Sequence, residues 1–215
     1  MYKKKPFLIV FEGVEGCGKT FQSKKLLNNL KRNKISTILT REPGGTKGAE
    51  LIRNLILKDY FKKNKKDKFD KYTDTLLYLA ARNEHIVEKI APALKKKKVI
   101  ICDRFIDSTL AYQVYGKKVN LNFINNIHKH ILRNIKPNIT FILKVSEKTS
   151  RKRLKKRKIK NRYDNFSQSF YTKAQNSFLK IAKNKKNYFI LNTSKNDNTT
   201  EKIIFNTVKK YLKKI

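Results

Sequence analysis

Apolar residues occur along the chain in two alternating patterns, short unbroken runs and longer series with helical spacing. The unbroken runs are rich in β-branched and aromatic residues, which is typical of buried strands. We expect strands over residues 7–11, 35–40, 99–102, 139–145 and 188–191. The spaced series repeat every three or four residues, as one face of a helix does. We expect helices over residues 21–32, 46–56, 72–90, 91–94, 121–135, 146–162, 166–182 and 199–212.

Strands that alternate with helices predict an α/β fold, in which five parallel strands form a doubly wound sheet flanked by helices. The chain has 215 residues, of which 39% are hydrophobic, so it suits a single domain over residues 1–215 with one core. Residues 59–71 are strongly charged and offer little to bury. We therefore expect a mobile surface loop there.

The first apolar run leads directly into Gly-x-x-x-x-Gly-Lys-Thr at residues 13–20. Gly13 and Gly18 permit the tight turn that brings main-chain N–H groups against phosphate oxygens. Lys19 would then reach the outer phosphates of ATP, and Thr20 would hold Mg²⁺. A strand before the motif and a helix after it are the required context, so we expect a fold of the P-loop NTPase type. The expected nucleotide-binding residues are Gly13, Glu15, Gly16, Cys17, Gly18, Lys19 and Thr20.

Lysine and arginine number 53 against 16 acidic residues, which gives a net charge of +37. Such a balance is typical of nucleic-acid-binding proteins. The lysines are nevertheless spread over almost every segment, together with abundant Asn, Ile, Phe and Tyr, as a bias toward A/T-rich codons would produce. We expect no specific nucleic-acid partner, and a basic nucleic-acid-binding module with a nucleotide-sensing loop stays open as an alternative.

The cysteines and the apolar runs limit where the protein can act. Cys17 and Cys102 lie far apart and form no Cys-x-x-Cys pair, so neither a disulfide framework nor a zinc site is indicated. No apolar run approaches the roughly 18 to 20 residues that span a bilayer. The basic start of the chain runs into the first strand without a small-residue cleavage site, which argues against a signal peptide. We expect a cytoplasmic protein with no membrane partner.

Phosphoryl transfer requires positioned phosphates, Mg²⁺ and cations that stabilise the charge of the transition state. Arg41 and Arg104 each follow a predicted strand, and the carboxyl ends of strands form the ligand-binding edge of an open α/β sheet. Three further arginines lie in a basic stretch that, taken alone, is most simply a solvated helix face. They are Arg153, Arg157 and Arg162.

Tyr78 and Arg82 are one turn apart on a predicted helix, so the ring and the guanidinium group can grip a planar base together. Without further support, Tyr78 is more simply a core or interface residue. Cys17 lies at the start of a helix, which can lower the pKa of a thiol, but a small space-filling side chain is the simpler interpretation. The three histidines have no ligand-like partners in the sequence, and we expect them to be structural or exposed. They are His85, His128 and His130.

Four segments resemble, in order and spacing, the thymidylate kinase family. They are residues 11–20 (FEGVEGCGKT), 41–46 (REPGGT), 76–82 (LLYLAAR) and 103–113 (DRFIDSTLAYQ), and the likeness extends from about residue 7 to residue 191. The resemblance implies a nucleoside monophosphate kinase-like fold with a basic lid at about residues 150–165. It further implies Mg²⁺-dependent transfer of the γ-phosphoryl group of ATP to dTMP, giving dTDP, by a homodimer. Another P-loop nucleoside or nucleotide kinase is the main alternative.

The resemblance also implies roles for single residues on the dTMP side. Arg41 and Arg104 would hold the phosphate, Glu15 would lie near the 3′-hydroxyl, and Tyr112 would crowd the 2′ position and so select deoxyribose. Tyr78 would stack on thymine, with Arg82 on its O4 edge and Thr109 near its N3. Gln113 is also expected among the substrate-binding residues.

Members of this family carry a catalytic arginine either in the phosphate loop or in the lid. The loop of this chain contains no arginine, so the resemblance assigns that charge to the lid. The implied catalytic set is Lys19, Arg104, Arg153, Arg157 and Arg162. The chain departs from the usual pattern in having Tyr78 in place of Phe and in having Asn161 where an acidic residue often precedes the lid arginine.

Overall fold

The computed structural model describes residues 5–58, 69–156, 167–195 and 198–213. Within these residues, a parallel sheet of five strands has the order β2-β3-β1-β4-β5. The strands are β1 (Phe7–Glu12), β2 (Thr37–Arg41), β3 (Val99–Asp103), β4 (Ile139–Lys144) and β5 (Tyr188–Asn192). The predicted strands and their parallel arrangement are confirmed.

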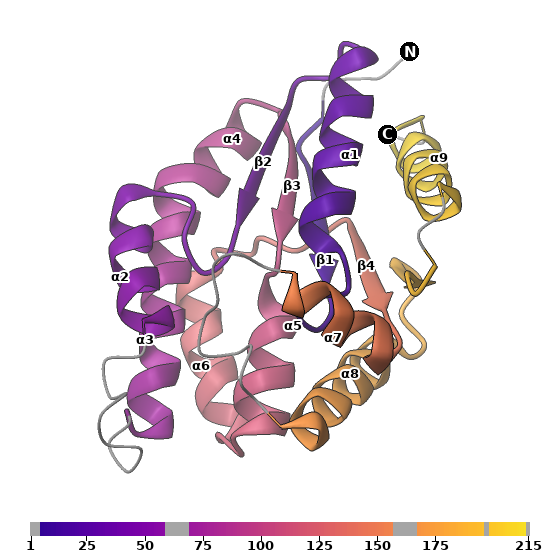
Figure 1. The fold of residues 1–215 in the computed structure, drawn as a ribbon. Helices are drawn as coiled ribbons and strands as arrows, with labels where there is room; N and C mark the ends of the chain where they lie inside the picture. The colour runs from indigo at the N-terminus through magenta and orange to yellow at the C-terminus, as the bar shows by residue number, and fades with distance from the viewer. Residues whose placement is uncertain (1–4, 59–68, 157–166, 196–197, 214–215) are drawn as a thin grey trace.

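Helices flank the sheet (Figure 1). The α-helices are α1 (Lys19–Arg32), α2 (Lys47–Leu57), α3 (Lys71–His85), α4 (Ala91–Lys95), α5 (Ile106–Thr109), α6 (Leu121–Ile131), α7 (Glu147–Lys155), α8 (Gln168–Ala182) and α9 (Thr199–Lys213), and the π-helical turns are η1 (Ile86–Ile90) and η2 (Leu110–Gly116). Helices α2 and α3 pack side by side at the β2 edge of the sheet, and α9 lies at the opposite side of the molecule (Figure 1).

Two helical predictions were wrong in part. The apolar pattern predicts no helix between residues 102 and 121, yet α5 and η2 form there and pack on α8. This segment is rich in β-branched and aromatic residues, which are weak helix formers, so tertiary packing determines its conformation. The helix predicted over residues 121–135 ends at Ile131, and Arg133 and Asn134 have left-handed backbone angles (φ 48° and 60°) that cannot continue it.

The first strand lies at the centre of the sheet and is buried on both faces. One face of β1 places Phe7, Ile9 and Phe11 in a large apolar cluster that includes Leu26 and Leu30 of α1. The other face joins Leu8 and Val10 to a second cluster beneath η1 and α4. Strands buried on both sides are expected in a parallel sheet, and they fix the positions of the loops at its carboxyl edge.

The pairing register of β1, β2 and β3 brings the loops that follow these strands together. Phe11 of β1 and Arg41 of β2 both lie opposite Asp103 of β3. Ligands bind at the carboxyl edge of such sheets, next to the point where the strand order reverses. The segments that follow β1, β2 and β3 therefore meet at one place, as the sequence analysis expected for Arg41 and Arg104.

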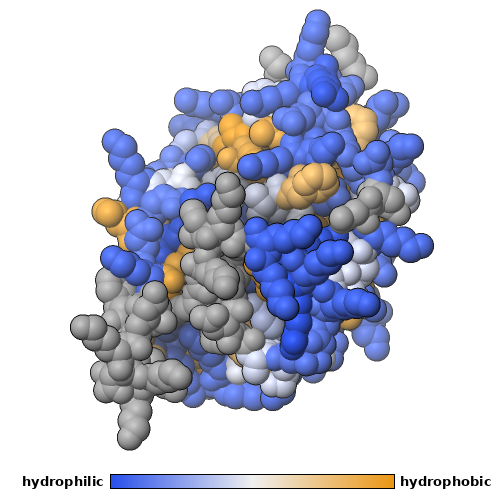
Figure 2. Space-filling view, viewed as in Figure 1, coloured by the Kyte–Doolittle hydropathy of each residue, from blue (hydrophilic) through white to orange (hydrophobic). Residues whose placement is uncertain are grey.

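Polar side chains cover most of the face seen in Figure 2. A dense group of strongly hydrophilic side chains lies over α7, whose sequence is EKTSRKRLK. The described part of the chain contains no helix that is both long enough and apolar enough to cross a membrane.

Candidate active site

The phosphate-loop motif connects β1 to α1 and requires glycine for steric reasons. Gly13 has φ 136°, and a Cβ atom there would lie 2.5 Å from the carbonyl oxygen of Leu143. Gly18, the N-cap of α1, is left-handed with φ 93°. No other residue adopts the first of these conformations without strain, so the loop shape that exposes main-chain N–H groups follows directly from the sequence.

The ammonium group of Lys19 folds back over this loop. Its Nζ donates hydrogen bonds of 2.9 Å to the carbonyl oxygens of both Gly13 and Val14, and it lies 3.6 Å from Cys17 Sγ. Burial raises the pKa of the Cys17 thiol despite the nearby Lys19 charge. Cys17 is therefore a buried space-filling residue, and a reactive thiolate at this position is not supported.

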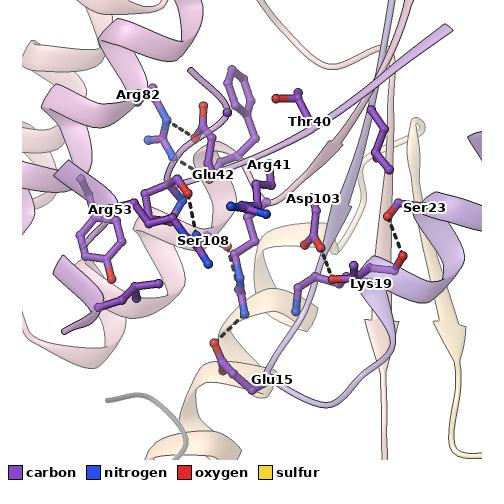
Figure 3. A pocket seen from close by; sticks show the side chains of 18 of the residues that line it. Glu15, Lys19, Ser23, Thr40, Arg41, Glu42, Arg53, Arg82, Asp103 and Ser108 are labelled. Carbon is purple, nitrogen blue, oxygen red and sulfur yellow. Dashed lines mark hydrogen bonds and ion pairs between the residues drawn. The ribbon is translucent and has the colours of Figure 1, made fainter. Parts of the chain in front are cut away.

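One cavity of about 1160 Å³ extends from the phosphate loop across the carboxyl edge of the sheet. A drug-sized ligand typically occupies a pocket of about 300–1,000 Å³, so this space can hold more than one small molecule. Figure 3 shows Glu15, Lys19, Arg41 and Asp103 arranged around it. The expected site residues that line the cavity are Glu15, Gly16, Gly18, Lys19, Thr20, Arg41, Tyr78, Arg82, Arg104, Thr109, Tyr112, Gln113 and Arg153.

Arg104, Glu15 and Tyr112 form a compact group beside the phosphate loop. Arg104 Nη2 donates to Glu15 Oε1 at 2.7 Å, and the Tyr112 hydroxyl donates to Glu15 Oε2 at 2.8 Å. Burial acts to raise the pKa of Glu15, but the charges of Arg104 and Lys19 and the Tyr112 hydrogen bond outweigh it and leave that pKa below its usual value. Glu15 is thus a carboxylate held in place on both oxygens.

Thr20 and Asp103 provide two oxygens next to the phosphate loop. Thr20 Oγ1 donates to Asp103 Oδ2 at 2.6 Å, although the two residues are 83 positions apart in the chain. Hard divalent cations prefer hydroxyl and carboxylate oxygens of this kind. From the sequence, Thr20 alone is predicted as a metal ligand, and Asp103 has no predicted role.

Arg41 and Arg53 bring positive charge to the opposite wall of the cavity. Arg41 Nη2 lies 3.0 Å from both carboxylate oxygens of Glu50, and its side chain is 53% exposed. An exposed pair of this kind contributes about 0–1 kcal/mol, so Arg41 can exchange Glu50 for a phosphate at little cost. Arg53 donates to the carbonyl oxygen of Pro43 at 2.6 Å and also lines the cavity. Sequence reasoning missed Arg53, because an arginine in an amphipathic helix gives no signal of its own.

Arg82 is almost completely buried, at 3% exposure, and anchors the far end of the cavity. Its Nε donates to Glu42 Oε2 at 2.8 Å, and its Nη2 donates to the Phe105 carbonyl oxygen at 2.8 Å. Its Nη1 lies 2.8 Å from Thr109 Oγ1 and 2.9 Å from His128 Nε2. Burial and the Arg82 charge lower the pKa of His128 to about 3, so this imidazole is neutral and accepts the hydrogen bond.

Two further expected residues complete this end of the cavity. Tyr78 lies on α3 one turn before Arg82 and is half-buried. Gln113 is 2% exposed, and its Nε2 has no hydrogen-bond partner within the described residues. A buried amide without a partner is unfavourable, which favours a ligand acceptor at this position. His85 and His128 are structural, and His130 is exposed, as expected.

Arg153 is the one lid arginine of the expected three that the structure describes. Its Nη1 donates to the Gly16 carbonyl oxygen at 3.1 Å, and its Nη2 donates to the Thr193 carbonyl oxygen at 2.7 Å. It thereby joins the phosphate loop to the segment after β5. Arg157 and Arg162 lie outside the described residues, as do residues 59–68 of the expected surface loop.

Comparison with known proteins bears directly on this arrangement. The family model for thymidylate kinase matches residues 11–204. The chain is 44% identical over 177 residues to a thymidylate kinase of Wolbachia pipientis, covering 81% of this chain and 84% of the relative. The chain belongs to the thymidylate kinase family.

Two further members of the family are similar to this chain over nearly its full length. A thymidylate kinase of the Aster yellows witches'-broom phytoplasma is 39% identical over 211 residues, covering 96% of this chain and 97% of the relative. The crystal structure of thymidylate kinase from Ehrlichia chaffeensis has a TM-score of 0.72 and 32% identity, covering 97% of this chain and 99% of that chain. The chain is therefore a kinase of the P-loop nucleoside monophosphate type, and the nucleic-acid-binding alternative is not favoured.

Two of the expected nucleotide-binding residues, Gly13 and Cys17, do not line the cavity. Gly13 lies against Leu143, and Cys17 is completely buried beneath the loop. Both shape the loop from behind. The groups that face the cavity are the main chain at Gly16 and Gly18 and the side chains of Glu15, Lys19 and Thr20.

Proposed function

We propose that this chain transfers the γ-phosphoryl group of ATP to dTMP, giving dTDP and ADP. One observation carries the proposal: a single cavity is lined by the phosphate loop and, farther along, by Arg41, Arg104, Tyr78 and Arg82. A donor phosphate and an acceptor phosphate would meet there. Catalysis of phosphoryl transfer comes almost entirely from positioning the two reactants in this way and from electrostatic stabilisation.

The donor half uses the phosphate loop. Main-chain N–H groups and the Lys19 ammonium would bind the phosphates of ATP, and Lys19 would leave its present partners, Gly13 O and Val14 O, to do so. Thr20 and Asp103 are suited to Mg²⁺, which would neutralise phosphate charge when bound. Arg153 would hold the loop, and Arg157 and Arg162 remain the proposed sources of lid charge.

The acceptor half uses Arg41 and Arg53 on the opposite wall and Arg104 beside the phosphate loop. Arg41 and Arg104 would bind the dTMP phosphate, and Arg53 adds a cation on the same side as Arg41. Burial and the neighbouring Arg41 charge lower the pKa of Arg53, so an anion placed between these groups would relieve their repulsion. Glu15 would accept a hydrogen bond from the 3′-hydroxyl of the deoxyribose. The Tyr112 hydroxyl donates to Glu15 and so fixes the ring, which would exclude a 2′-hydroxyl on the sugar.

The base would lie at the end of the cavity, on Tyr78. Four of the five N–H groups of Arg82 have partners among Glu42, Thr109, His128 and the Phe105 carbonyl, so within the described structure a single N–H on Nη2 remains to donate. A carbonyl at O4 of thymine suits that donor, whereas the amino group of cytosine does not. Gln113 would add the second polar contact.

A coupled assay of ADP release across nucleoside monophosphates tests the proposal. Release with dTMP should exceed release with dCMP, dGMP or AMP by a factor of roughly 10⁴, because a site built around buried donors rejects a base that leaves them unpaired. Equal rates across the panel would refute dTMP as the substrate. A clear preference for another monophosphate would support the alternative nucleotide kinase.

We also propose that the protein acts as a homodimer through α2 and α3. Leu51 and Leu55 share one face of α2, and Leu51 is 73% exposed. Leu76 of α3 and Val87 of η1 are exposed as well, and α2 and α3 lie side by side (Figure 1). Exposed apolar side chains gathered on adjacent helices are typical of a protein interface.

Leu51→Lys is expected to convert the dimer to a monomer, because it places a charge in an apolar interface. Mass measured by light scattering during size-exclusion chromatography reports the change. Ile203→Lys is the matched control, since Ile203 is 43% exposed on α9 at the other side of the molecule. A monomeric mass for the unaltered chain at micromolar concentration would contradict the dimer.

A further inference from the structure

Glu12 is the last residue of β1, yet its side chain does not serve the phosphate loop that follows it. The side chain is completely buried. Its Oε1 accepts hydrogen bonds from the main-chain N–H groups of Phe105, at 2.8 Å, and of Ser108, at 3.2 Å. Its Oε2 lies 2.6 Å from Ser108 Oγ. Glu12 therefore binds the segment that leaves β3 at three points.

That segment contains Arg104 in an unusual conformation. Arg104 has φ 73°, in the left-handed region that residues other than glycine seldom occupy. Its main-chain N–H donates to the Phe11 carbonyl oxygen at 2.9 Å. The contacts of Phe11 and Glu12, adjacent residues of β1, thus hold both sides of Arg104. A left-handed residue persists only where its surroundings fix it in this way.

The same contacts continue to the guanidinium group. Arg104 Nη1 donates to Ser108 Oγ at 3.1 Å and to the Gly13 carbonyl oxygen at 3.0 Å, while Nη2 donates to Glu15. Ser108 thus connects the carboxyl group of Glu12 to the guanidinium group of Arg104. The order of contacts is Glu12, Ser108 and Arg104, which we call the Glu12 relay.

The protonation state of Glu12 does not interrupt the relay. Burial and the nearby Asp107 charge raise the pKa of Glu12 to about 8. As a carboxylate, Glu12 accepts a hydrogen bond from the Ser108 hydroxyl, and as a carboxylic acid it donates a hydrogen bond to Ser108 Oγ. A hydroxyl oxygen has two lone pairs, so in both cases one lone pair of Ser108 Oγ stays directed at Arg104.

We propose that Glu12 is a positioning residue, which through Ser108 and the main chain at Phe105 sets the direction in which Arg104 presents its guanidinium group to the acceptor phosphate. The proposal rests on the proposed function, because it takes Arg104 as a ligand of the dTMP phosphate. Glu12 itself does not line the cavity. Its effect on dTMP is therefore exerted entirely through the residues of the relay.

Ser108→Ala tests the relay without removing a charge. The variant should raise the KM for dTMP roughly three- to tenfold, as expected for one lost hydrogen bond, with the KM for ATP unchanged. Ser108→Thr keeps the hydroxyl and should restore the KM. Ser177→Ala is the control, since Ser177 Oγ donates to the Lys173 carbonyl oxygen in α8, away from the cavity. Equal changes in both Michaelis constants would overturn the proposal.

Glu12→Gln and Glu12→Leu separate positioning from packing. Gln keeps an acceptor for the Phe105 and Ser108 N–H groups and should change the KM for dTMP little, whereas Leu fills the space without an acceptor and should raise it more than Ser108→Ala does. A Leu variant that folds with a normal KM for dTMP would overturn the proposal. If the Leu variant does not fold, a double-mutant cycle between Ser108→Ala and Arg104→Ala still tests the contact by which the relay reaches the guanidinium group.

A double-mutant cycle between Ser108→Ala and Arg104→Ala isolates the pathway of the effect. Binding of dTMP without ATP, measured by calorimetry, should weaken with Ser108→Ala in the unaltered chain and should not weaken further when Arg104 is already Ala. The same factor in both backgrounds would mean that Ser108 acts on dTMP without Arg104, and the relay would be wrong. If the unaltered chain neither binds nor phosphorylates dTMP, the proposed function fails instead, and that outcome is recognised before any variant is made.

Discussion

Lys19→Ala is expected to lower the turnover number by a factor of about 10²–10³ or more while the fold is retained, because removing one fixed charge from the position where transition-state charge develops typically costs that much. Lys19 is the ammonium group that the phosphate loop encloses, with hydrogen bonds to Gly13 O and Val14 O. The rate of ADP release at saturating dTMP and ATP measures the loss.

Two controls accompany the Lys19 variant. Circular dichroism and the thermal midpoint of unfolding should stay near those of the unaltered chain, because the lost hydrogen bonds are local to the loop. Lys25 lies on the same helix, α1, and its Nζ pairs with Glu201 at 3.4 Å on the surface. Lys25→Ala should therefore leave turnover unchanged. Near-normal turnover of the Lys19 variant would show that the loop does not bind the transferred phosphate as proposed.

The strands and most helices could be predicted because their signal is local. The apolar runs of β1, β3 and β4 are almost entirely buried, and a short β-branched run of this kind favours a strand whatever surrounds it. Caps were equally visible: Thr46 was expected to begin a helix, and its hydroxyl accepts from the Ala49 N–H. The segment 106–116 was not predictable in this way, because its helical form depends on packing against α8.

The site residues likewise divide into those with a local sequence signal and those that depend on tertiary structure. Most of the expected residues of the phosphate loop and the strand ends do line the cavity, since motif and topology determine their positions. The roles that we propose for Arg53, Asp103 and Glu12 were missed, because they depend on side-chain directions that only the tertiary structure fixes. Glu12 is the clearest case. It is an acidic residue only three positions before Glu15, so the sequence alone does not distinguish their roles. Glu12 nevertheless contacts Phe105 and Ser108, which lie 93 and 96 positions away.

Arg82→Leu is expected to lower the free energy of unfolding by about 3–5 kcal/mol, the largest effect on stability that we predict, because removing one partner of a buried pair leaves the other charge uncompensated. The side chains of Arg82 and Glu42 are each only 4% exposed, and their ion pair spans 2.8 Å. In a chain of 215 residues the thermal midpoint should fall by roughly 6–20 °C. Arg41→Leu, which breaks an exposed pair with Glu50, should cost about 1 kcal/mol or less.

The pH dependence of the stability loss in Arg82→Leu tests whether the Glu42 carboxylate causes that loss. Burial acts to raise the pKa of Glu42, but Arg82 and His85 outweigh it and leave the pKa below the ordinary value of 4.5. A carboxyl with a depressed pKa stabilises the fold above about pH 4.5, and that contribution disappears as the pH falls through the folded-state value. The difference in unfolding free energy between the unaltered chain and Arg82→Leu should therefore shrink as the pH falls from neutral through about 4.5 and below. Glu42→Gln should restore part of the stability of Arg82→Leu at neutral pH, because it removes the charge that has lost its partner. The contrary result is a double variant that is less stable than Arg82→Leu by as much as Glu42→Gln alone destabilises the unaltered chain. That result would show that the buried carboxylate does not destabilise the Arg82 variant.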